Sequence, residues 1–480
     1  MGDATEKDSA AKDEEADRYG CLGAAQANAW EPQGAVVFEN ATVLDGTADM
    51  EPRPGQTVVV EGRSISFVGP RDQAPTAPEG ARVVDLAGAY LMPGLVNMHV
   101  HLMGTGDEKG VSVPEGQPVG SDACKRACMD DPQRLHAYLA ESAANALASG
   151  VTTLRDAGEA FSGDIWLRDA IDAGQVVGPR VIASGNGITV PEGHASRLLS
   201  RVAHTPEEAA CYVRDFKELG ATSIKLFVTG GVLDAEKIGE PGVLRMSPAI
   251  TKAACDEAHR LGLPVMAHVE STEGVKSALE NGVDTIEHGA PMTPEIVELY
   301  KKRGAAVTCT LSPAVALTVL PTRDENPSEM LLVNAKVVAQ GVADSARAAL
   351  DNDIPLGLGT DASCPYITQY DTWRELAYCV RYLGVTPAFA LHTATQVDAQ
   401  ILGLGDVCGT VEAGKDADLI VTRDNPLENI AALRHVAMVM TRGRLLADPQ
   451  VKRIEQIEAD LDWLDAQPDA IEPRPAGSLA

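Results

Sequence analysis

The hydrophobic and polar positions of the chain follow two different patterns. Short β-branched runs separated by turn signals occupy residues 36–68 and return at residues 418–441. Such runs are typical of antiparallel strands. Between them, helical stretches end at a Gly and a short, almost continuous apolar run follows. The pattern predicts a small β domain, assembled from both ends of the chain, around a long α/β middle.

The repeat in the middle predicts a parallel barrel. Gly readily takes the left-handed conformation just after a helix, so each unit predicts helix, Gly, strand. Strands buried on both faces and alternating with helices form parallel sheets, and eight such units predict a (β/α)8 barrel of the TIM type. The expected strands are 95–99, 151–154, 181–183, 223–227, 264–268, 285–288, 306–309 and 355–358.

Four parts of the chain follow from these patterns. They are an acidic, disordered leader at 1–32, a composite β-sandwich domain at 33–90 plus 405–450, the barrel at 91–404, and a helix and tail at 451–480. The leader shows no hydrophobic periodicity, which predicts disorder. In the last part, apolar residues from Ile454 to Leu464 have helical spacing.

A long loop follows the first predicted barrel strand. Residues 104–131 are rich in Gly, Pro and charge. Loops of that length at the catalytic face of a barrel are often lids or specificity elements, and an ordinary surface excursion is the alternative.

Composition and charge exclude several classes of partner. The 480 residues are 45% apolar, and 40 basic against 69 acidic residues give a net charge of -29. A negative field repels nucleic acid and anionic membranes, so neither is expected as a partner. No apolar run reaches the roughly 18 residues that span a bilayer. With nine irregularly spaced Cys, the chain is predicted to be a cytoplasmic protein with reduced thiols.

Metal-binding residue types recur at the predicted strand ends, where a barrel carries its active site. His99 and His101 are two residues apart, which points both rings to one side of a strand. A lone strand His is more often a core or surface residue than a ligand. Six compatible residues in order on five strands instead predict a metal site. They are His99, His101, Lys225, His268, His288 and Asp361.

Lys225 is the unusual member of this set. An ammonium in an apolar strand inside a barrel is costly unless it is paired or chemically changed. If carbon dioxide converts the amine to a carbamate, Lys225 becomes an anionic oxygen ligand able to bridge two cations. This is a hypothesis that depends on its position.

Seven stretches resemble the amidohydrolase superfamily of metal-dependent hydrolases. Within it, the chain is similar to imidazolonepropionase-like proteins, Xaa-Pro and Xaa-Arg dipeptidases and ochratoxin-hydrolysing amidases. The stretches are 91–101, 150–156, 223–231, 267–268, 286–289, 358–361 and 409–419.

The resemblance implies a binuclear site. His99 and His101 would hold the more buried cation, His268 and His288 the more exposed one, carboxylated Lys225 would bridge them, and Asp361 would bind metal and act as general acid and base. Zn is the first expectation, and Mn, Fe or Co also suit the ligands. A water shared by two cations is acidified and gives a bridging hydroxide near pH 7. The resemblance also implies a small-molecule substrate and a homo-oligomer, tetramer or octamer.

Three residues are candidates for substrate binding. His194 aligns with a third-strand His that contacts substrate in relatives, and a surface-loop His is the alternative. Arg155 could hold a substrate carboxylate, although a structural role is equally open. Glu270 stands where dipeptidase relatives commonly have a His, which weakens any transfer of their substrate preference.

The leading functional prediction is hydrolysis of the C–N bond of a small amide, an N-acyl amino acid or a dipeptide. Hydrolysis of a carbamate, thiocarbamate or phenylurea, or of a cyclic imidazolone-type amide, uses the same chemistry. A one-metal deaminase is disfavoured by Lys225, although Glu270 fits one. A non-catalytic scaffold would be expected to have lost ligands, and all six are present.

Overall fold

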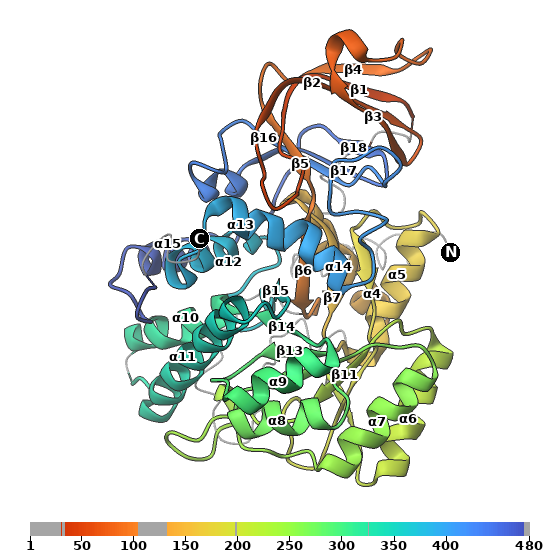
Figure 1. Ribbon diagram of the computed structural model, residues 1–480. Helices are drawn as coiled ribbons and strands as arrows, with labels where there is room; N and C mark the ends of the chain where they lie inside the picture. The colour runs from red at the N-terminus through yellow and green to blue at the C-terminus, as the bar shows by residue number, and fades with distance from the viewer. Residues whose placement is uncertain (1–29, 31–33, 104–131, 197–198, 325, 475–480) are drawn as a thin grey trace, which may run out of the picture.

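The structure, a computed structural model, describes residue 30 and residues 34–103, 132–196, 199–324 and 326–474. The predicted leader, apart from Trp30, and the predicted lid at 104–131 lie outside the described residues. A small sheet stands above a larger body in which helices surround a group of strands (Figure 1).

The small sheet combines the two ends of the chain, as the pattern predicts. Its strands are β1 (Val36–Val43), β2 (Arg53–Glu61), β3 (Ser64–Pro70), β4 (Arg82–Asp85), β5 (Tyr90–Pro93), β16 (Leu419–Thr422), β17 (Val436–Thr441) and β18 (Arg444–Leu446). The order is β18-β17-β16-β5-β1-β2-β3, with β4 paired to β1. β5 and β16 join the two ends in antiparallel register, Leu91 opposite Val421. The hydrogen bonds thus connect all eight strands into one continuous sheet, curved over its own apolar core.

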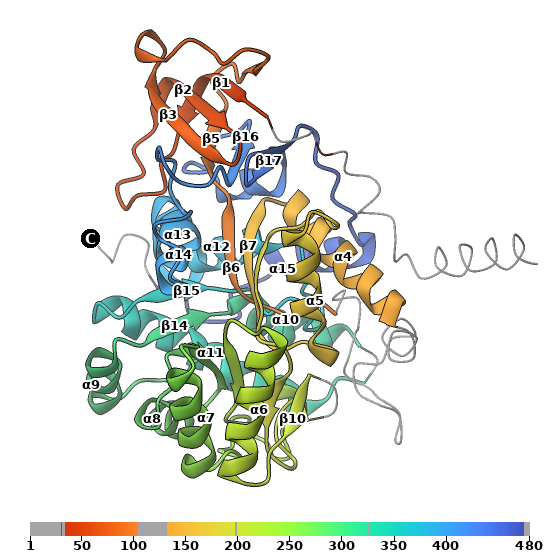
Figure 2. The same cartoon turned by 90° about the vertical axis from the view of Figure 1, so that its right-hand side faces the viewer.

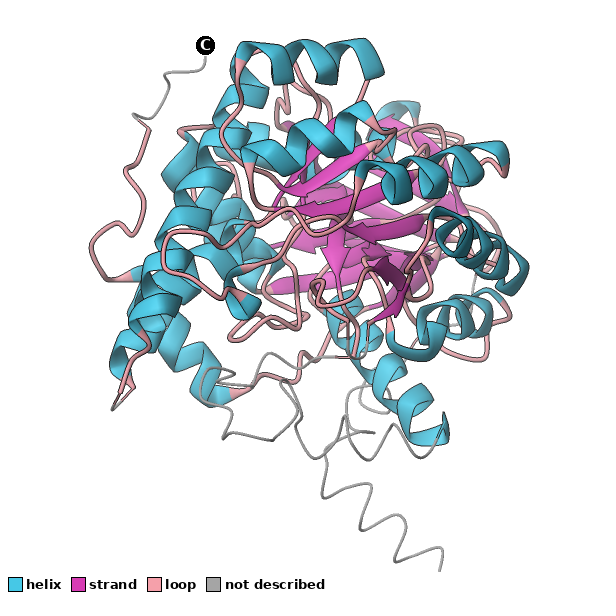
Figure 3. Ribbon diagram, turned by 90° about the horizontal axis from the view of Figure 1, so that it is seen from below, coloured by secondary structure: helices cyan, strands magenta, loops and turns pink. Residues whose placement is uncertain are grey.

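The barrel has a strand at each of the eight predicted places. They are β6 (Leu95–Val100), β7 (Val151–Asp156), β8 (Arg180–Ile182), β11 (Ile224–Phe227), β12 (Val265–Val269), β13 (Thr285–His288), β14 (Ala306–Cys309) and β15 (Leu356–Leu358). Short strands β9 (Gly187–Thr189) and β10 (Ser200–Val202) extend the sheet beside β11. The ring closes where the amide of Asp361, just beyond β15, donates to the carbonyl of His99, 2.8 Å away. Figure 3 shows the strands enclosed by helices.

Helices cover the outside of the barrel. The described ones are α4 (Pro132–Ala148), α5 (Gly163–Asp172), α6 (Pro206–Leu219), α7 (Pro248–Arg260), α8 (Thr272–Glu280), α9 (Pro294–Arg303), α10 (Leu311–Val319), α11 (Glu329–Asp351), α12 (Thr372–Tyr378), α13 (Pro387–His392), α14 (Asp398–Ile401) and α15 (Glu455–Asp465). Ser or Thr hydroxyls cap several of them, such as Thr205 before α6 and Thr293 before α9. Gly220 and Gly304 end these two helices in the left-handed conformation, as the repeat predicts.

The C-terminal helix α15 packs on the barrel through ion pairs. We call its acidic side chains and the arginines they meet the C-terminal clasp. The clasp comprises Glu458, Asp460, Asp462 and Asp465 of α15 with Arg323, Arg374 and Arg434. Arg374 is almost fully buried and pairs with both Asp462 and Asp465. Much of the acidity of the C-terminal end is therefore paired with barrel arginines.

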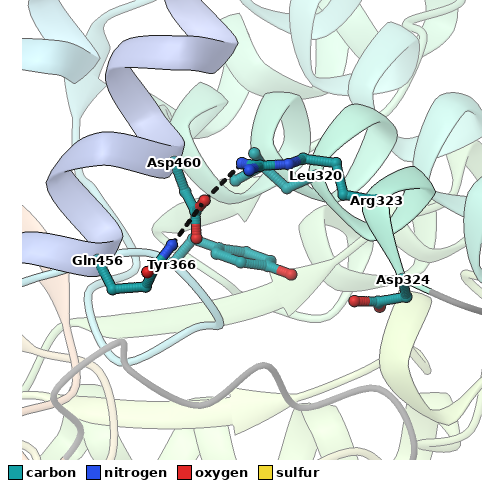
Figure 4. A pocket seen from close by; sticks show the side chains of 6 residues that line it. All are labelled: Leu320, Arg323, Asp324, Tyr366, Gln456 and Asp460. Atoms are coloured by element: carbon teal, nitrogen blue, oxygen red, sulfur yellow. Dashed lines mark hydrogen bonds and ion pairs between the residues drawn. The ribbon is translucent and has the colours of Figure 1, made fainter.

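One corner of the clasp borders a small cavity of about 110 Å³. Arg323 bridges to Asp460 at 2.5 Å across it, and Tyr366 and Gln456 form its walls (Figure 4). Figure 2 shows β6 running from the small sheet into the barrel, which connects the two sheets directly. Among the described residues, none of the helices has the length and apolar character needed to cross a bilayer.

Candidate metal centre

The six predicted ligands lie together at the carboxyl ends of the barrel strands. Ring nitrogens of His99 and His101 and a carboxylate oxygen of Asp361 all lie within 4.8 Å of one another. A second group at the same spacing contains His268 and His288. The two groups adjoin, because the ring centres of His99 and His288 are 4.9 Å apart. Lys225 Nζ completes the cluster 3.3 Å from His99 Nε2.

Partners behind the first pair of rings fix which nitrogen faces the cluster. His101 Nδ1 lies 2.8 Å from the carbonyl of Gly158, which can only accept, so this nitrogen carries the hydrogen. His101 Nε2 is left with a free lone pair and lies 3.3 Å from Asp361 Oδ1. His99 Nδ1 lies 2.7 Å from Glu287 Oε2, which likewise leaves His99 Nε2 toward Lys225. A backing acceptor of this kind is typical of metal-binding His.

The second pair of rings is fixed in the same way. His268 Nε2 donates to the carbonyl of Gly230 at 3.2 Å, so its Nδ1 is the free nitrogen. His288 Nδ1 lies 2.7 Å from Thr310 Oγ1. His288 itself has a φ of 68°, a left-handed conformation that is uncommon outside Gly and is typical of constrained functional sites.

Burial keeps the rings neutral. Desolvation, with Lys225 nearby, lowers the pKa of His99 to about 4. Burial also holds the pKa values of His268 and His288 well below their usual range, and neighbouring His and Lys side chains add to the effect. Neutral imidazole is the form that binds a cation, so these rings need not lose a proton to do so.

Asp361 faces three of the four rings from the loop after β15. Burial alone would raise its pKa, but His99, His101 and His288 outweigh that effect and hold the pKa well below the usual range. Its backbone is also left-handed, with a φ of 53°. The carboxylate is thus an ionised oxygen donor, and Cys364 Sγ lies 3.1 Å from its second oxygen.

Lys225 is buried in β11 with its amine at the centre of the cluster. Desolvation lowers the pKa of this amine to about 8, although Glu287 and Asp361 act in the opposite direction. Within the described part of the chain, no carboxylate lies at ion-pair distance from Nζ.

Arg155 lies beneath the cluster instead of at its open side. Its guanidinium donates to the carbonyl of Met98, to the hydroxyls of Thr285 and Thr308, and to Glu287 at 2.7 Å. Arg155 is buried, and these contacts do not support the predicted role in holding a substrate carboxylate. The contacts explain Glu287 instead. Burial would raise the pKa of Glu287, but Arg155 and His99 lower it to about 2.

His194 lies over the second pair of rings. Its ring stacks on that of His268 with centres 4.2 Å apart and planes 5° apart. Its Nδ1 is 3.1 Å from Asp234 Oδ2, and the other oxygen of Asp234 accepts from the amide of Gly231 at 2.6 Å. A side chain on Gly231 would approach both rings, 2.9 Å from His194 Cε1. Gly231 and Asp234 therefore set the orientation of His194.

Glu270 joins His268 and His288 in the second group, with a carboxylate oxygen within 4.8 Å of their nitrogens. Its Oε2 is buried and has no hydrogen-bond partner among the described residues. Burial, with Asp234 and Asp361 nearby, raises the pKa of Glu270 to about 8.

The donor set fits divalent cations. Four rings present nitrogens to two adjoining groups of donors, one carboxylate is ionised, and one oxygen of Glu270 has no hydrogen bond among the described residues. Three supporting residues were missed from the sequence: Glu287, Thr310 and Asp234. Glu287 lies inside the stretch 286–289 that carried the resemblance, so its position next to His288 was the available signal. Asp234 lies in a loop without periodicity and gave none.

Comparisons with known proteins place the cluster in a wider context. A family model described as the amidohydrolase family matches residues 90–446. The chain is 26% identical over 432 residues to ochratoxinase of Aspergillus niger, which covers 84% of this chain and 85% of that protein. A crystal structure of a candidate prolidase from Bifidobacterium longum has a TM-score of 0.79 and 36% identity, and covers 91% of this chain and all of that one. A Xaa-Pro dipeptidase with methionine bound in its active site has a TM-score of 0.72 and 27% identity, and covers 86% and 99%.

Proposed function

The chain belongs to the amidohydrolase family, and from that premise we propose that it is a binuclear metal hydrolase that cleaves the C–N bond of a small amide. The observation that carries the proposal is the set of four His rings that lie together with ionised Asp361 and the Lys225 amine.

His99 and His101, with Asp361, would hold the inner cation, and His268 and His288 the outer one. Two cations bound there supply Lewis acidity, which lowers the pKa of a shared water and polarises the scissile carbonyl. Zn is the first candidate, and Mn, Fe and Co suit the same donors.

Lys225 would join the two halves after carboxylation. Its Nζ lone pair forms a bond to the carbon of carbon dioxide and the amine loses one proton, which yields an anionic carbamate. Burial without an ion-pair partner supports this modification, since it replaces a costly buried ammonium with an anion between cations. We expect Lys225→Ala to lose metal and short carboxylic acids to restore it, and a variant that retains both cations without them would contradict the carbamate.

Asp361 would move the proton in this reaction. Its ionised carboxylate accepts a proton from the attacking water and returns it to the leaving nitrogen. His194, oriented by Asp234 through Nδ1, would direct its Nε2 to the substrate. Neither role involves Arg155, whose guanidinium is engaged with Glu287 and neighbouring oxygens.

The substrate class we favour is a dipeptide or an N-acyl amino acid. Two of the solved structures reported above are described as a candidate prolidase and a Xaa-Pro dipeptidase, and ochratoxinase is a relative. The test is a screen of Xaa-Pro and other dipeptides, N-acyl amino acids, carbamates, thiocarbamates, phenylureas and imidazolones, with enzyme reconstituted in Zn, Mn or Co. Turnover of only the carbamates or ureas would reject the favoured class, and ammonia release from an amine would indicate a deaminase.

We also propose that the protein is a cytoplasmic homo-oligomer. Apolar side chains are exposed beside one another near α11, among them Ile238 and Val337 at 55% and 45%. The loop that contains Ile238 is held to α11 by the side chain of Asn334, which accepts from the amide of Gly239 and donates to the carbonyl of Lys237. Light scattering after gel filtration should give a multiple of the chain mass, and Ile238→Lys should reduce it. A wild-type monomer would reject the proposal.

A further inference from the structure

Glu270 is a half-buried acid at the edge of the metal centre, and its carboxylate has a backbone hydrogen bond from Val232 but no ion pair among the described residues. It follows β12, two residues after His268, so the two side chains lie on the same side of the extended chain. One of its carboxylate oxygens is within 4.8 Å of ring nitrogens of both His268 and His288. Oε2 has no hydrogen-bond donor among the described residues, and it is shielded from solvent.

The backbone around Glu270 holds the side chain toward this position. Its amide donates to Thr229 Oγ1 at 3.0 Å. Gly242 packs so closely on the other side that an added Cβ would lie 2.2 Å from the carbonyl oxygen of Glu270. The segment is therefore clamped between β11's following loop and the loop at Gly242, and the carboxylate has little freedom to turn to solvent.

The surroundings do not supply the missing positive charge. The charged groups acting on Glu270 include two other acids, Asp234 and Asp361. A carboxylate with one shielded, unbonded oxygen beside like charges is costly unless a cation or a further hydrogen-bond donor meets that oxygen. The two neutral rings that flank it provide lone pairs rather than charge, and their free nitrogens face the same space.

We propose that Glu270 is a third protein ligand of the outer cation, together with His268 and His288. This inference rests on the proposed function only in requiring that a cation binds at this pair of His. A set of two His and one carboxylate is a common site for catalytic divalent cations. A carboxylate oxygen is a harder donor than an imidazole nitrogen. Compared with a site of two rings alone, an outer site that includes Glu270 therefore has a stronger preference for Mn.

Glu270→Gln is the direct test, because it removes the charge while keeping the shape. Purified full-length wild type, Glu270→Gln and the control Glu273→Gln, an exposed Glu on α8, would be titrated with Mn and with Zn against a fluorescent chelator. Metal content would be measured by mass spectrometry. We expect the weaker of the two cation affinities to fall by at least about tenfold in Glu270→Gln and to stay unchanged in Glu273→Gln.

A second variant separates ligation from folding. Glu270→His supplies a nitrogen donor at the same place and is expected to retain two cations, with its preference shifted from Mn toward Zn. Circular dichroism would check that all variants fold. If folded Glu270→Gln binds the same number of cations as wild type with the same affinities, the assignment is overturned. The same result overturns it if wild type binds only one cation.

The metal readout is independent of substrate. If no amide is hydrolysed but Glu270→Gln loses outer-cation affinity, the proposed function fails and the ligand assignment stands. If Glu270→Gln keeps both cations but KM rises only for dipeptides with a free amino group, Glu270 binds the substrate ammonium and the ligand assignment fails.

Discussion

The metal centre and the C-terminal clasp both bury charged side chains, but they balance the charge in different ways. In the clasp, each arginine meets a carboxylate: Arg434 to Glu458 at 2.5 Å and Arg374 to Asp462 at 2.6 Å. In the centre, burial keeps His99, His268 and His288 neutral, and neither Lys225 nor Glu270 forms an ion pair among the described residues. The clasp is thus held by ion pairs within the protein. The described residues of the centre instead leave donor atoms that a bound cation could fill.

The largest effect that this comparison predicts is on turnover. Asp361→Asn removes the proposed proton acceptor of the centre without changing the clasp, and we expect kcat to fall by about 10²–10⁴-fold. The measurement is steady-state kinetics on whichever substrate the screen identifies. Unfolding midpoints should remain near wild type, and turnover near the wild-type rate would remove Asp361 from the mechanism.

Breaking the clasp should instead affect stability. Arg374→Met removes a buried cation, but its partners Asp462 and Asp465 are partly exposed and Asp462 keeps its pair with Arg434, so we expect a loss of about 1–3 kcal/mol in the free energy of unfolding, measured with urea. The control is Arg381→Met, whose guanidinium and partner Asp469 are both partly exposed, and whose ion pair is worth about 0–1 kcal/mol. Equal losses in the two variants would contradict the distinction between a buried and a partly exposed arginine.

A smaller effect concerns the support behind the rings. Thr310→Val keeps the volume but removes the hydroxyl beside His288 Nδ1, so the affinity for the outer cation should fall by roughly 10–100-fold. Thr318→Val, which removes a hydroxyl that bonds only to Val315 within α10, is the control. Both are measured by chelator competition. Unchanged affinity in Thr310→Val would mean that the ring is oriented by packing alone.

The smallest effect is on the acid side of the pH range. Burial would raise the pKa of Asp462, but Arg434 and Arg374 outweigh it and lower the pKa. A lowered folded-state pKa stabilises the fold at pH values above the unfolded pKa, near 3.9, and this stability is lost as pH falls through the folded value. The free energy of unfolding, measured with urea, should therefore drop less below pH 4 in Asp462→Asn than in wild type. The difference should be about 1 kcal/mol or less. Parallel pH profiles would contradict this.

The sequence pattern was sufficient to predict the barrel and the clustering of the candidate ligands at its strand ends. Gly after a helix and an apolar run after the Gly are local signals, and the topology then brings His99, Lys225 and Asp361 together. Membership in the amidohydrolase family, predicted from seven stretches, is confirmed.

Interactions between distant segments could not be predicted in this way. Arg155 stands at a strand end like the ligands, but only the fold reveals that its side chain meets Glu287, 132 positions away in sequence. The partners of the α15 acids could not be predicted either, because these arginines lie about 30 to 140 positions away in the sequence. Likewise, alternation within strands predicts a buried face for the small sheet domain but not the order in which its strands pair.

The pairing of β5 with β16 has a consequence for how the molecule is made. β5 leads through Gly94 directly into β6, which carries His99. One neighbour of β5 in the sheet, β1, precedes it in the chain, but the other, β16, begins only at Leu419. During synthesis the first barrel strand is therefore anchored to an unfinished sheet until most of the chain has left the ribosome. Contacts this distant in sequence form slowly, and unpaired strand edges invite wrong pairing meanwhile. We therefore expect His99 and His101 to become fixed in place only after β16 has been synthesised and has paired with β5.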